Sequence, residues 1–434
     1  MLMLQPLAGV AQSLSKAGPE FRANTYTTGF QSSPAVAVGT RGQFVVTWGS
    51  EGSFGSDLGS SIQAQQFNGD GSRRGVEFQV NSYTTSWQLW PAVAMNKIND
   101  FVIVWASLGS YGSDTDWFSI QGQRFNAAGT QLGSQFQIST YTTDWQLLPE
   151  ITAGGAGQFI VAWDSFGSAG TDNDGYSVQG QRLGAGANAI GPEFQVNTYT
   201  TRRQYFPGIA ADGQGNFIVV WESQGSSGND QHGASVQGQR FAASGLPIGN
   251  EFQINTYTTG GQRSPSVAMS TSGEFMVVWE SNSERENVTQ GYVVQGQSFA
   301  ADGSRLGAEF QVHTTTTIGN RWPAVAAESS GNFAVAWGRY NYNATVPRGD
   351  IFSRRVSRTG TLLGEEVQTS TYFQGFKSIP AIAPQANGFV VVWRAEYGSG
   401  PLGIEVKGQR LSTLAVPPSL FSDGFESGNT AAWD

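Results

Sequence analysis

Short apolar runs that end in tryptophan recur along the whole chain at nearly constant spacing. These tryptophans lie 56 to 58 residues apart, and a second run of the Glu-Phe-Gln-Val-Asn type recurs every 57 or 58 residues in the same register. The tryptophans are Trp48, Trp105, Trp163, Trp221, Trp279, Trp337 and Trp393. A repeat of this length is typical of propellers and solenoids.

Each unit contains four short strand-like runs, which the fourth unit shows at 207–211, 216–221, 235–241 and 250–255. The second run is continuously apolar, as expected for a strand that is covered on both faces. No segment has a sustained helical period of 3.6 residues. Four short antiparallel strands per repeat predict the blade of a propeller.

The phase of the repeat predicts how the ring closes. The chain opens with an isolated fourth strand at 19–24 and ends with three strands near 381–383, 388–393 and 404–411. Pairing the first of these with the last three removes the exposed strand edges. We therefore predict an all-β fold, a seven-bladed β-propeller with four antiparallel strands per blade, whose N-terminal strand completes the last blade.

The positions at which the repeats begin and end divide the chain into three parts. Residues 1–16 are a lead-in or the remnant of a truncated signal peptide, and both alternatives stay open because the basic segment of a signal is missing. Residues 17–411 form the propeller, and 412–434 are a Pro-containing spacer and tail. The predicted blades are 26–82, 83–140, 141–198, 199–256, 257–314, 315–371, and 372–411 together with 17–25.

The amino-acid composition disfavours some classes of ligand and environment. With 24 basic and 33 acidic residues the net charge is −9, which disfavours nucleic acid as a ligand. The chain has no cysteine, and no run approaches the ~20 apolar residues that a membrane span needs. We therefore predict neither disulfides nor membrane insertion. The oligomeric state stays open.

Four glycines recur inside the third strand of successive units, at Gly122, Gly180, Gly238 and Gly296. A glycine within a strand often marks the close approach of a bulky neighbour. We expect the indole of the second strand to cover each of them, so the tryptophan series is predicted to form core.

The two longer loops of each unit are expected to share one face, where propellers hold ligands. The loops between blades follow a Tyr-Thr-Thr-x-x-Gln pattern, with aromatic residues added unequally. Rings beside amides and hydroxyls suit sugar stacking or a protein partner, whereas the Thr and Gln residues can simply organise the loop. Trp90 and Trp322, each beside a proline, can instead wedge between blades. The predicted ligand-binding residues are Trp87, Gln88, Trp145, Gln146, Gln204, Tyr205, Phe206 and Gln262.

The loops after the second strand share a Gly-Ser-Asp pattern in the first four units only. Aspartate with free carbonyls in a Gly-rich loop suits a hard cation, so calcium is a candidate cofactor; an Asx turn is the alternative. The candidate calcium ligands are Asp57, Asp114, Asp172 and Asp230.

Catalytic signatures are scarce. The two histidines, His232 and His313, fall in different units, and His313 replaces the strand-end asparagine found at Asn197. A Ser/His/Asp triad or a histidine metal site is therefore not expected, and we predict that the chain is not an enzyme. Carboxylate chemistry is the alternative, because an acid follows the second-strand tryptophan in three units and can face the channel: Asp164, Glu222 and Glu280.

Four motifs of the repeat are 193–198 (Glu-Phe-Gln-Val-Asn-Thr), 265–268 (Pro-Ser-Val-Ala), 273–279 (Gly-Glu-Phe-Met-Val-Val-Trp) and 238–245 (Gly-Gln-Arg-Phe-Ala-Ala-Ser-Gly). Together they resemble a group of secreted bacterial propeller repeats. The match covers residues 17 to about 411. The resemblance implies export to the cell surface, the medium or the periplasm, and interaction or adhesion; it implies no reaction. The architecture is also similar to bacterial seven-bladed fucose-binding lectins.

Together these patterns predict an exported, non-catalytic binding or adhesion module that uses its long-loop face. A carbohydrate is the first candidate ligand and a protein the second. A display or spacer domain and a carboxylate-based hydrolase are the alternatives.

Overall fold

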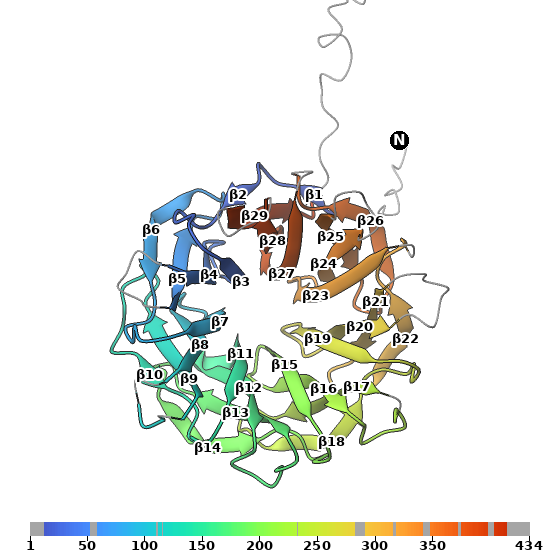
Figure 1. Ribbon diagram of the computed structural model, residues 1–434. Coiled ribbons are helices and arrows are strands. Elements are labelled where there is room, and N and C mark those ends of the chain that lie inside the picture. The colour runs from blue at the N-terminus through green and yellow to red at the C-terminus, as the bar shows by residue number, and fades with distance from the viewer. Residues whose placement is uncertain are drawn as a thin grey trace, which may run out of the picture.

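The computed structural model describes residues 13–414 except 53–58, 110–111, 115, 232, 283–290, 316–317, 342–347, 372–374 and 398–402. In these residues the chain forms β-strands and a single 3-10 turn, η1 (Gly155–Gly157), with no α-helix. The strands form antiparallel sheets that radiate from a central axis (Figure 1). The predicted all-β, propeller-like arrangement of four-stranded antiparallel sheets is confirmed.

Five sheets contain four strands each, in chain order from the axis outwards. The first contains β3 (Gln31–Val38), β4 (Phe44–Glu51), β5 (Ser60–Phe67) and β6 (Arg73–Gln79), and the second β7 (Gln88–Met95), β8 (Phe101–Leu108), β9 (Phe118–Phe125) and β10 (Phe136–Gln137). The third contains β11 (Gln146–Ala153), β12 (Phe159–Phe166), β13 (Tyr176–Leu183) and β14 (Ala189–Gln195). The fourth contains β15 (Gln204–Ala211), β16 (Phe217–Gln224), β17 (Ala234–Phe241) and β18 (Pro247–Gln253), and the fifth β19 (Gln262–Met269), β20 (Phe275–Asn282), β21 (Tyr292–Phe299) and β22 (Arg305–Gln311).

The remaining strands form one nine-stranded sheet that includes the N-terminus. One half contains β23 (Gly319–Ala327), β24 (Phe333–Asn341), β25 (Arg348–Val356) and β26 (Leu362–Gln368). The other contains β27 (Phe376–Gln385), β28 (Gly388–Glu396) and β29 (Ile404–Ser412), with β1 (Ser15–Lys16) and β2 (Phe21–Arg22). A parallel bridge between Gly349 and Phe376 connects the halves. Because the halves count as one sheet, seven blades stay a prediction.

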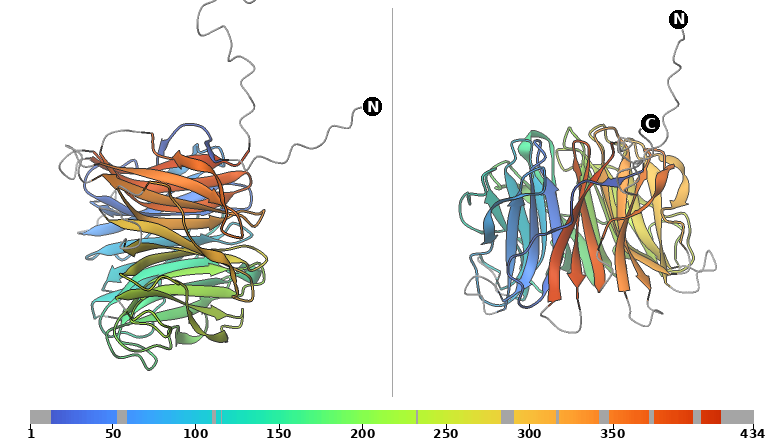
Figure 2. Two further views of the ribbon diagram at one scale, coloured as in Figure 1. Left: turned by 90° about the vertical axis from the view of Figure 1, so that its right-hand side faces the viewer. Right: turned by 90° about the horizontal axis from the view of Figure 1, so that it is seen from above.

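The N-terminal strands close the ring as the repeat phase predicts. Phe21 of β2 pairs with Gly408 of β29, and Ser15 of β1 pairs with Ser412 further along the same strand. The innermost strands β3, β7, β11, β15, β19, β23 and β27 each contact the next, and β27 contacts β3. In the side views of Figure 2 the strands run from one face of a disc to the other.

Each innermost strand has an irregularity at its proline that shapes the central channel. The residue before the proline has a positive φ, between 48° and 54°, and the ladder to the second strand shifts register there. This left-handed backbone removes the residue's N–H from the ladder and makes it available to another partner. The seven residues are Ser33, Trp90, Leu148, Phe206, Ser264, Trp322 and Ile379.

The core lies between neighbouring sheets. Trp163 is fully buried and packs against Val104 and Ile120 of the preceding sheet. The tryptophan series therefore forms core, as predicted. The strand glycines have a different neighbour, however: a side chain added at Gly180 would come within 2.7 Å of the ring of Phe194 in the fourth strand. The expectation that the indole covers these glycines is wrong, because Gly180 is paired directly with Phe194.

Candidate functional site

Three buried carboxylates connect successive sheets at their long-loop ends. Asp164, Glu222 and Glu280 follow the second-strand tryptophan and are at most 3% exposed. The carboxylate of Glu280 accepts the backbone N–H of Trp322 at 2.7 Å, and that of Glu222 accepts the N–H of Ser264 at 3.2 Å. These donors are the N–H groups that the bulge before each proline releases from the ladder. The carboxylates therefore clamp each sheet to the next.

Two of these carboxylates, Glu222 and Glu280, also contact arginine or tyrosine side chains. Arg321 Nε lies 3.1 Å from Glu280, Arg263 Nε lies 3.9 Å from Glu222, and Tyr205 donates its hydroxyl hydrogen to Glu222 at 2.7 Å. Burial raises the pKa of Glu222 and Glu280, although their partners oppose the shift. Burial and the charge of Glu222 raise the pKa of Tyr205, so the phenol keeps its proton. The cluster thus holds charged and proton-donating groups together.

A cavity of about 520 Å³ opens beside this cluster, at the long-loop ends of the inner strands. Its volume falls in the usual range of small-ligand sites, about 300–1,000 Å³. It combines three aromatic rings, of which that of Phe206 is exposed, with two arginines and two carboxylates. The lining residues that bear these groups are Glu150, Tyr205, Phe206, Glu222, Arg263, Arg321 and Trp322.

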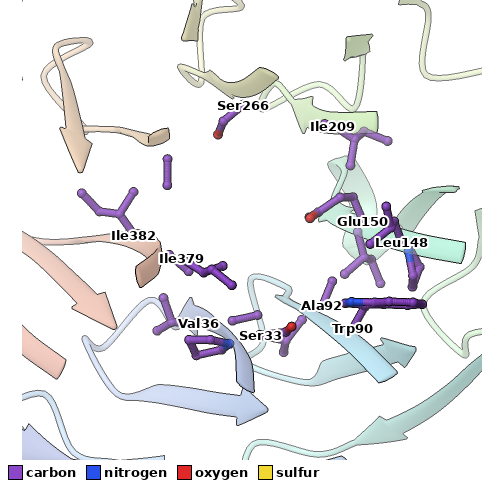
Figure 3. A pocket seen from close by; sticks show the side chains of 18 of the residues that line it. Ser33, Val36, Trp90, Ala92, Leu148, Glu150, Ile209, Ser266, Ile379 and Ile382 are labelled. Carbon is purple, nitrogen blue, oxygen red and sulfur yellow. The ribbon is translucent and has the colours of Figure 1, made fainter. Parts of the chain in front are cut away.

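Glu150 is the carboxylate that distinguishes this region from the rest of the ring. It follows Pro149 on β11, and its side chain points into the central channel, a cavity of about 400 Å³ (Figure 3). The other inner strands carry alanine, glycine or serine at this position: Ala35, Ala92, Gly208, Ser266, Ala324 and Ala381.

The surroundings of Glu150 prepare it for proton transfer. The side chain is exposed to the channel. Desolvation by the protein around the channel raises the pKa of Glu150 to about 7. A carboxylic acid that titrates near neutral pH can donate or accept a proton during a reaction. Sequence reasoning missed Glu150, although a charge at a position that is otherwise small was a visible signal.

The four glutamines predicted to bind ligand are fully buried. Each accepts a hydrogen bond at its amide oxygen from the indole N–H of the second-strand tryptophan in the same sheet. The pairs are Gln88 with Trp105 at 2.8 Å, Gln146 with Trp163 at 3.3 Å, Gln204 with Trp221 at 3.1 Å, and Gln262 with Trp279 at 2.9 Å. This arrangement gives them a structural role, so we leave them out of the candidate site.

The predicted aromatic residues lie in different places. Tyr205 and Phe206 line the 520 Å³ cavity, whereas Trp145 lines a separate one. Trp87 is 57% exposed and lines none of the cavities described here. Trp322 borders the 520 Å³ cavity and packs edge-on against Tyr340 at 5.1 Å. The ring centroid of Trp90 lies 6.2 Å from that of Phe118 in the same sheet, and Trp90 packs against the core shared by the second and third sheets.

The candidate calcium ligands organise loops within the described residues. Asp172 and Asp230 are buried and accept hydrogen bonds from the side chains of Asn197 and Asn255, at 2.6 and 2.7 Å. Asp114 is also buried and accepts the backbone N–H of Asp116, as in an Asx turn. Asp57 lies outside the described residues. Nowhere in the described part of the chain do three or more His, Cys, Asp or Glu side chains form a metal-binding group.

His313 takes over the role of a strand-end asparagine. Its Nε2 accepts the backbone N–H of Val294 at 3.1 Å and its Nδ1 faces the carbonyl of Thr315 at 2.8 Å. Asn197 makes the same two bonds with its side-chain amide, to the equivalent backbone groups two sheets earlier. His232 lies outside the described residues. His313 is therefore a structural residue.

Replacing His313 with alanine should lower the free energy of unfolding by about 1–3 kcal/mol, because two buried backbone groups lose their partner. His313→Asn should restore both bonds and most of the stability. Burial lowers the pKa of His313 to about 4, so the unfolded chain binds more protons and stability should fall as the pH drops from about 6.5 towards 4. Denaturant unfolding at pH 7 and pH 5 measures both effects; an equal pH dependence in wild type and His313→Asn would contradict the titration.

The comparisons with known proteins give the fold and no family. No protein-family model matches the sequence, and no curated protein matches it. Among solved structures, the chain is similar to the polysaccharide lyase Uly1, with a TM-score of 0.55 and 10% identity over 92% of this chain and 100% of that one. It is also similar to a Penicillium chrysogenum α-L-arabinanase bound to arabinobiose, with a TM-score of 0.50 and 11% identity over 91% and 99%.

A third similar structure is the β-propeller domain of the trilobed protease of Pyrococcus furiosus, with a TM-score of 0.50 and 9% identity over 92% of this chain and 100% of that one. The chain is a β-propeller. The specific resemblance to secreted bacterial repeats stays a prediction.

These similarities contradict the prediction that the chain is not an enzyme. The prediction rested on missing histidine triads and metal motifs, whereas solved propellers of this shape include a polysaccharide lyase and an arabinanase. The prediction was wrong to equate those missing motifs with a missing activity, because carboxylates and a tyrosine can also transfer protons. At 9–11% identity the likeness defines the fold alone, so any reaction must be argued from the site.

Proposed function

We propose that this propeller binds an oligosaccharide at the channel mouth and cleaves its glycosidic bonds. The observation that carries the proposal is Glu150, a lone carboxylate among small residues, with its pKa raised to about 7 at the edge of a 520 Å³ cavity. Two similar structures support a sugar ligand, since one is bound to arabinobiose and the other is a polysaccharide lyase.

The side chains around Glu150 have complementary roles in this proposal. Glu150 is the proton donor to the departing glycosidic oxygen, because a large fraction of it carries a proton at neutral pH. As the C–O bond breaks, either water adds to the anomeric carbon or the ring loses a C–H proton and forms a double bond. The proton released by the water or by the ring carbon restores the acid form of Glu150. Phe206, which is 41% exposed, and Trp322 offer ring faces for sugar stacking. Arg263 and Arg321 place positive charge where negative charge develops on the substrate.

Two wider features belong to the same proposal. We count the nine-stranded sheet as two blades, which gives a seven-bladed ring; the closed succession of inner strands supports this count. We also place the protein outside the cytoplasm, as the resemblance to exported repeats implies. No helix in the described part of the chain is long and apolar enough to cross a membrane.

A panel of purified polysaccharides tests the proposal, with ulvan, polygalacturonate and linear arabinan among them. We expect release of reducing ends from at least one. Ultraviolet absorbance of an unsaturated product separates elimination from hydrolysis. Binding without release of reducing ends would contradict cleavage, and the absence of both would contradict the whole proposal.

A further inference from the structure

A second cavity of about 420 Å³ lies on the long-loop face, away from Glu150. It is lined by aromatic and charged side chains at the ends of three consecutive sheets, the second to the fourth: Trp117, Asp144, Trp145, Phe166, Tyr176 and Arg203. Three of these rings are unusually exposed, Trp117 by 53% and Trp145 and Phe166 by 41% each. Exposed rings that share a concave site are typical of binding surfaces and are costly to leave in water.

A hydrogen bond links the two segments that carry the tryptophans. The carboxylate of Asp116, the residue before Trp117, accepts the backbone N–H of Asp144, the residue before Trp145, at 3.3 Å. The two indoles lie edge to face, with centroids 5.9 Å apart. Trp117 also adopts a left-handed backbone with φ of 61°, which is rare for a bulky residue and costs on the order of 1–3 kcal/mol.

A second pair of rings and a cation also line this outer cavity. Phe166 and Tyr176 meet edge to face with centroids 5.2 Å apart, and the guanidinium of Arg203 lies 5.9 Å from the ring centre of Tyr176. Arg203 is exposed. A sugar ring in this cavity can stack on an aromatic face while an acidic substituent pairs with the guanidinium.

A small cavity of about 220 Å³ adjoins the channel mouth. It is lined by Arg202, Tyr205 and Arg263 among others, and the last two also line the 520 Å³ cavity beside Glu150. Arg202 is the chain neighbour of Arg203, which lines the outer cavity. Each of the three cavities therefore carries at least one arginine, and consecutive residues of one loop line the outer and the small cavity.

We propose that the outer cavity is a remote sugar subsite and that the three cavities bind one anionic polysaccharide, with uronate or sulfate groups paired to the arginines. This inference rests on the proposed function, which supplies the glycan and the reaction centre. The three cavities are lined by four arginines and three carboxylates, those of Asp144, Glu150 and Glu222, whereas the whole chain has a net charge of −9. A polymer can occupy several cavities at once, whereas a mono- or disaccharide would fill only one.

Affinity electrophoresis in native gels tests the inference without requiring catalysis. Polygalacturonate and ulvan serve as anionic probes and linear arabinan as the neutral one. We expect the wild type to be retarded by at least one anionic polymer, less so at high ionic strength, which screens the arginines. Trp117→Ala and Trp145→Ala should each weaken the apparent affinity about tenfold, the loss typical of a stacking anchor.

Phe30→Ala is the matched control. Phe30 occupies the loop position of Trp145 two sheets earlier and is 39% exposed, close to the 41% of Trp145, but it lines none of the three cavities. Its variant should be retarded like the wild type. Arg203→Ala should reduce the retardation by the anionic polymers and leave that by arabinan unchanged.

Three results would overturn the inference: no retardation by either anionic polymer, equal or stronger retardation by arabinan, or tryptophan variants that bind like the wild type. Glu150→Gln should retain the electrophoretic retardation while it loses turnover. Loss of the tryptophan effect with turnover still dependent on Glu150 would overturn the outer subsite alone. Turnover that does not depend on Glu150 would instead overturn the proposed function.

Discussion

Replacing Glu150 with glutamine should lower the rate of glycan cleavage by about 10²–10⁴-fold, the usual contribution of a positioned general acid. Glutamine keeps the size and polarity of the side chain and removes the titrating proton. Steady-state kinetics on the polysaccharide that the wild type cleaves measures the effect, which should appear in kcat. Thermal unfolding of both proteins checks that the fold is retained.

The same variant should change the pH dependence. Because Glu150 is the proton donor and its pKa is raised to about 7, wild-type turnover should fall as the pH rises through about 7. Stability follows the same group: the folded chain binds the proton more tightly than the unfolded chain does. Stability should therefore decline from about pH 4.5 to pH 7, and Glu150→Gln should flatten that decline.

Ala35→Gln is the control for Glu150→Gln. Ala35 takes the position of Glu150 on β3, lines the channel and does not line the cavity beside Glu222. The variant introduces the same amide into the channel on another sheet, so it should keep the wild-type rate. A Glu150→Gln enzyme with full activity, or an Ala35→Gln enzyme that loses as much, would exclude Glu150 as the proton donor.

The propeller fold could be predicted from the sequence because every unit repeats the same pattern of strands and tryptophans. The spacing of the tryptophans predicts the propeller, and the single strand at 19–24 predicts the closure onto β29 that Phe21 makes with Gly408. The role of His313 could also be predicted, since it stands where other units carry asparagine. A residue that recurs at the same position of many units can therefore be assigned a structural role, and a residue that differs there stands out.

The candidate site was harder to predict for two physical reasons. An amide at a loop end can form a hydrogen bond with a ligand or with a buried indole N–H. The position of Gln204 in the sequence therefore does not tell which of the two partners it has. The cavity beside Glu222 also joins side chains from residue 148 to residue 380, which only ring closure brings together. Glu150 is the exception: comparing aligned inner-strand positions would have identified it.

The arginines illustrate the same limit. Arg263 and Arg321 each follow the loop amide by one position, and nothing in the repeat indicates that they approach the acid of the preceding sheet. In the structure Arg321 pairs with Glu280, 41 residues earlier in the chain. Contacts between sheets depend on the radial packing of whole blades, which the pattern within one unit does not encode.

Replacing Trp221 with alanine should lower the free energy of unfolding by about 3–5 kcal/mol, because the indole is fully buried between sheets.

Phenylalanine substitutions at two equivalent tryptophans separate the stability that the indole hydrogen bond contributes from the stability that the buried volume contributes. Trp221 donates to Gln204 at 3.1 Å, whereas the indole N–H of Trp393 has no hydrogen-bond partner among the described residues. The reason is that Lys377, which cannot accept a hydrogen bond, replaces the glutamine there.

Trp221→Phe should therefore cost about 1–3 kcal/mol more than Trp393→Phe, the penalty for leaving the buried amide of Gln204 without its donor. Both substitutions remove a similar volume from similar cores, so the difference isolates the hydrogen bond. Guanidinium unfolding of the two variants and the wild type measures it. Equal losses would show that the hydrogen bond between Trp221 and Gln204 adds no stability beyond the volume of the indole.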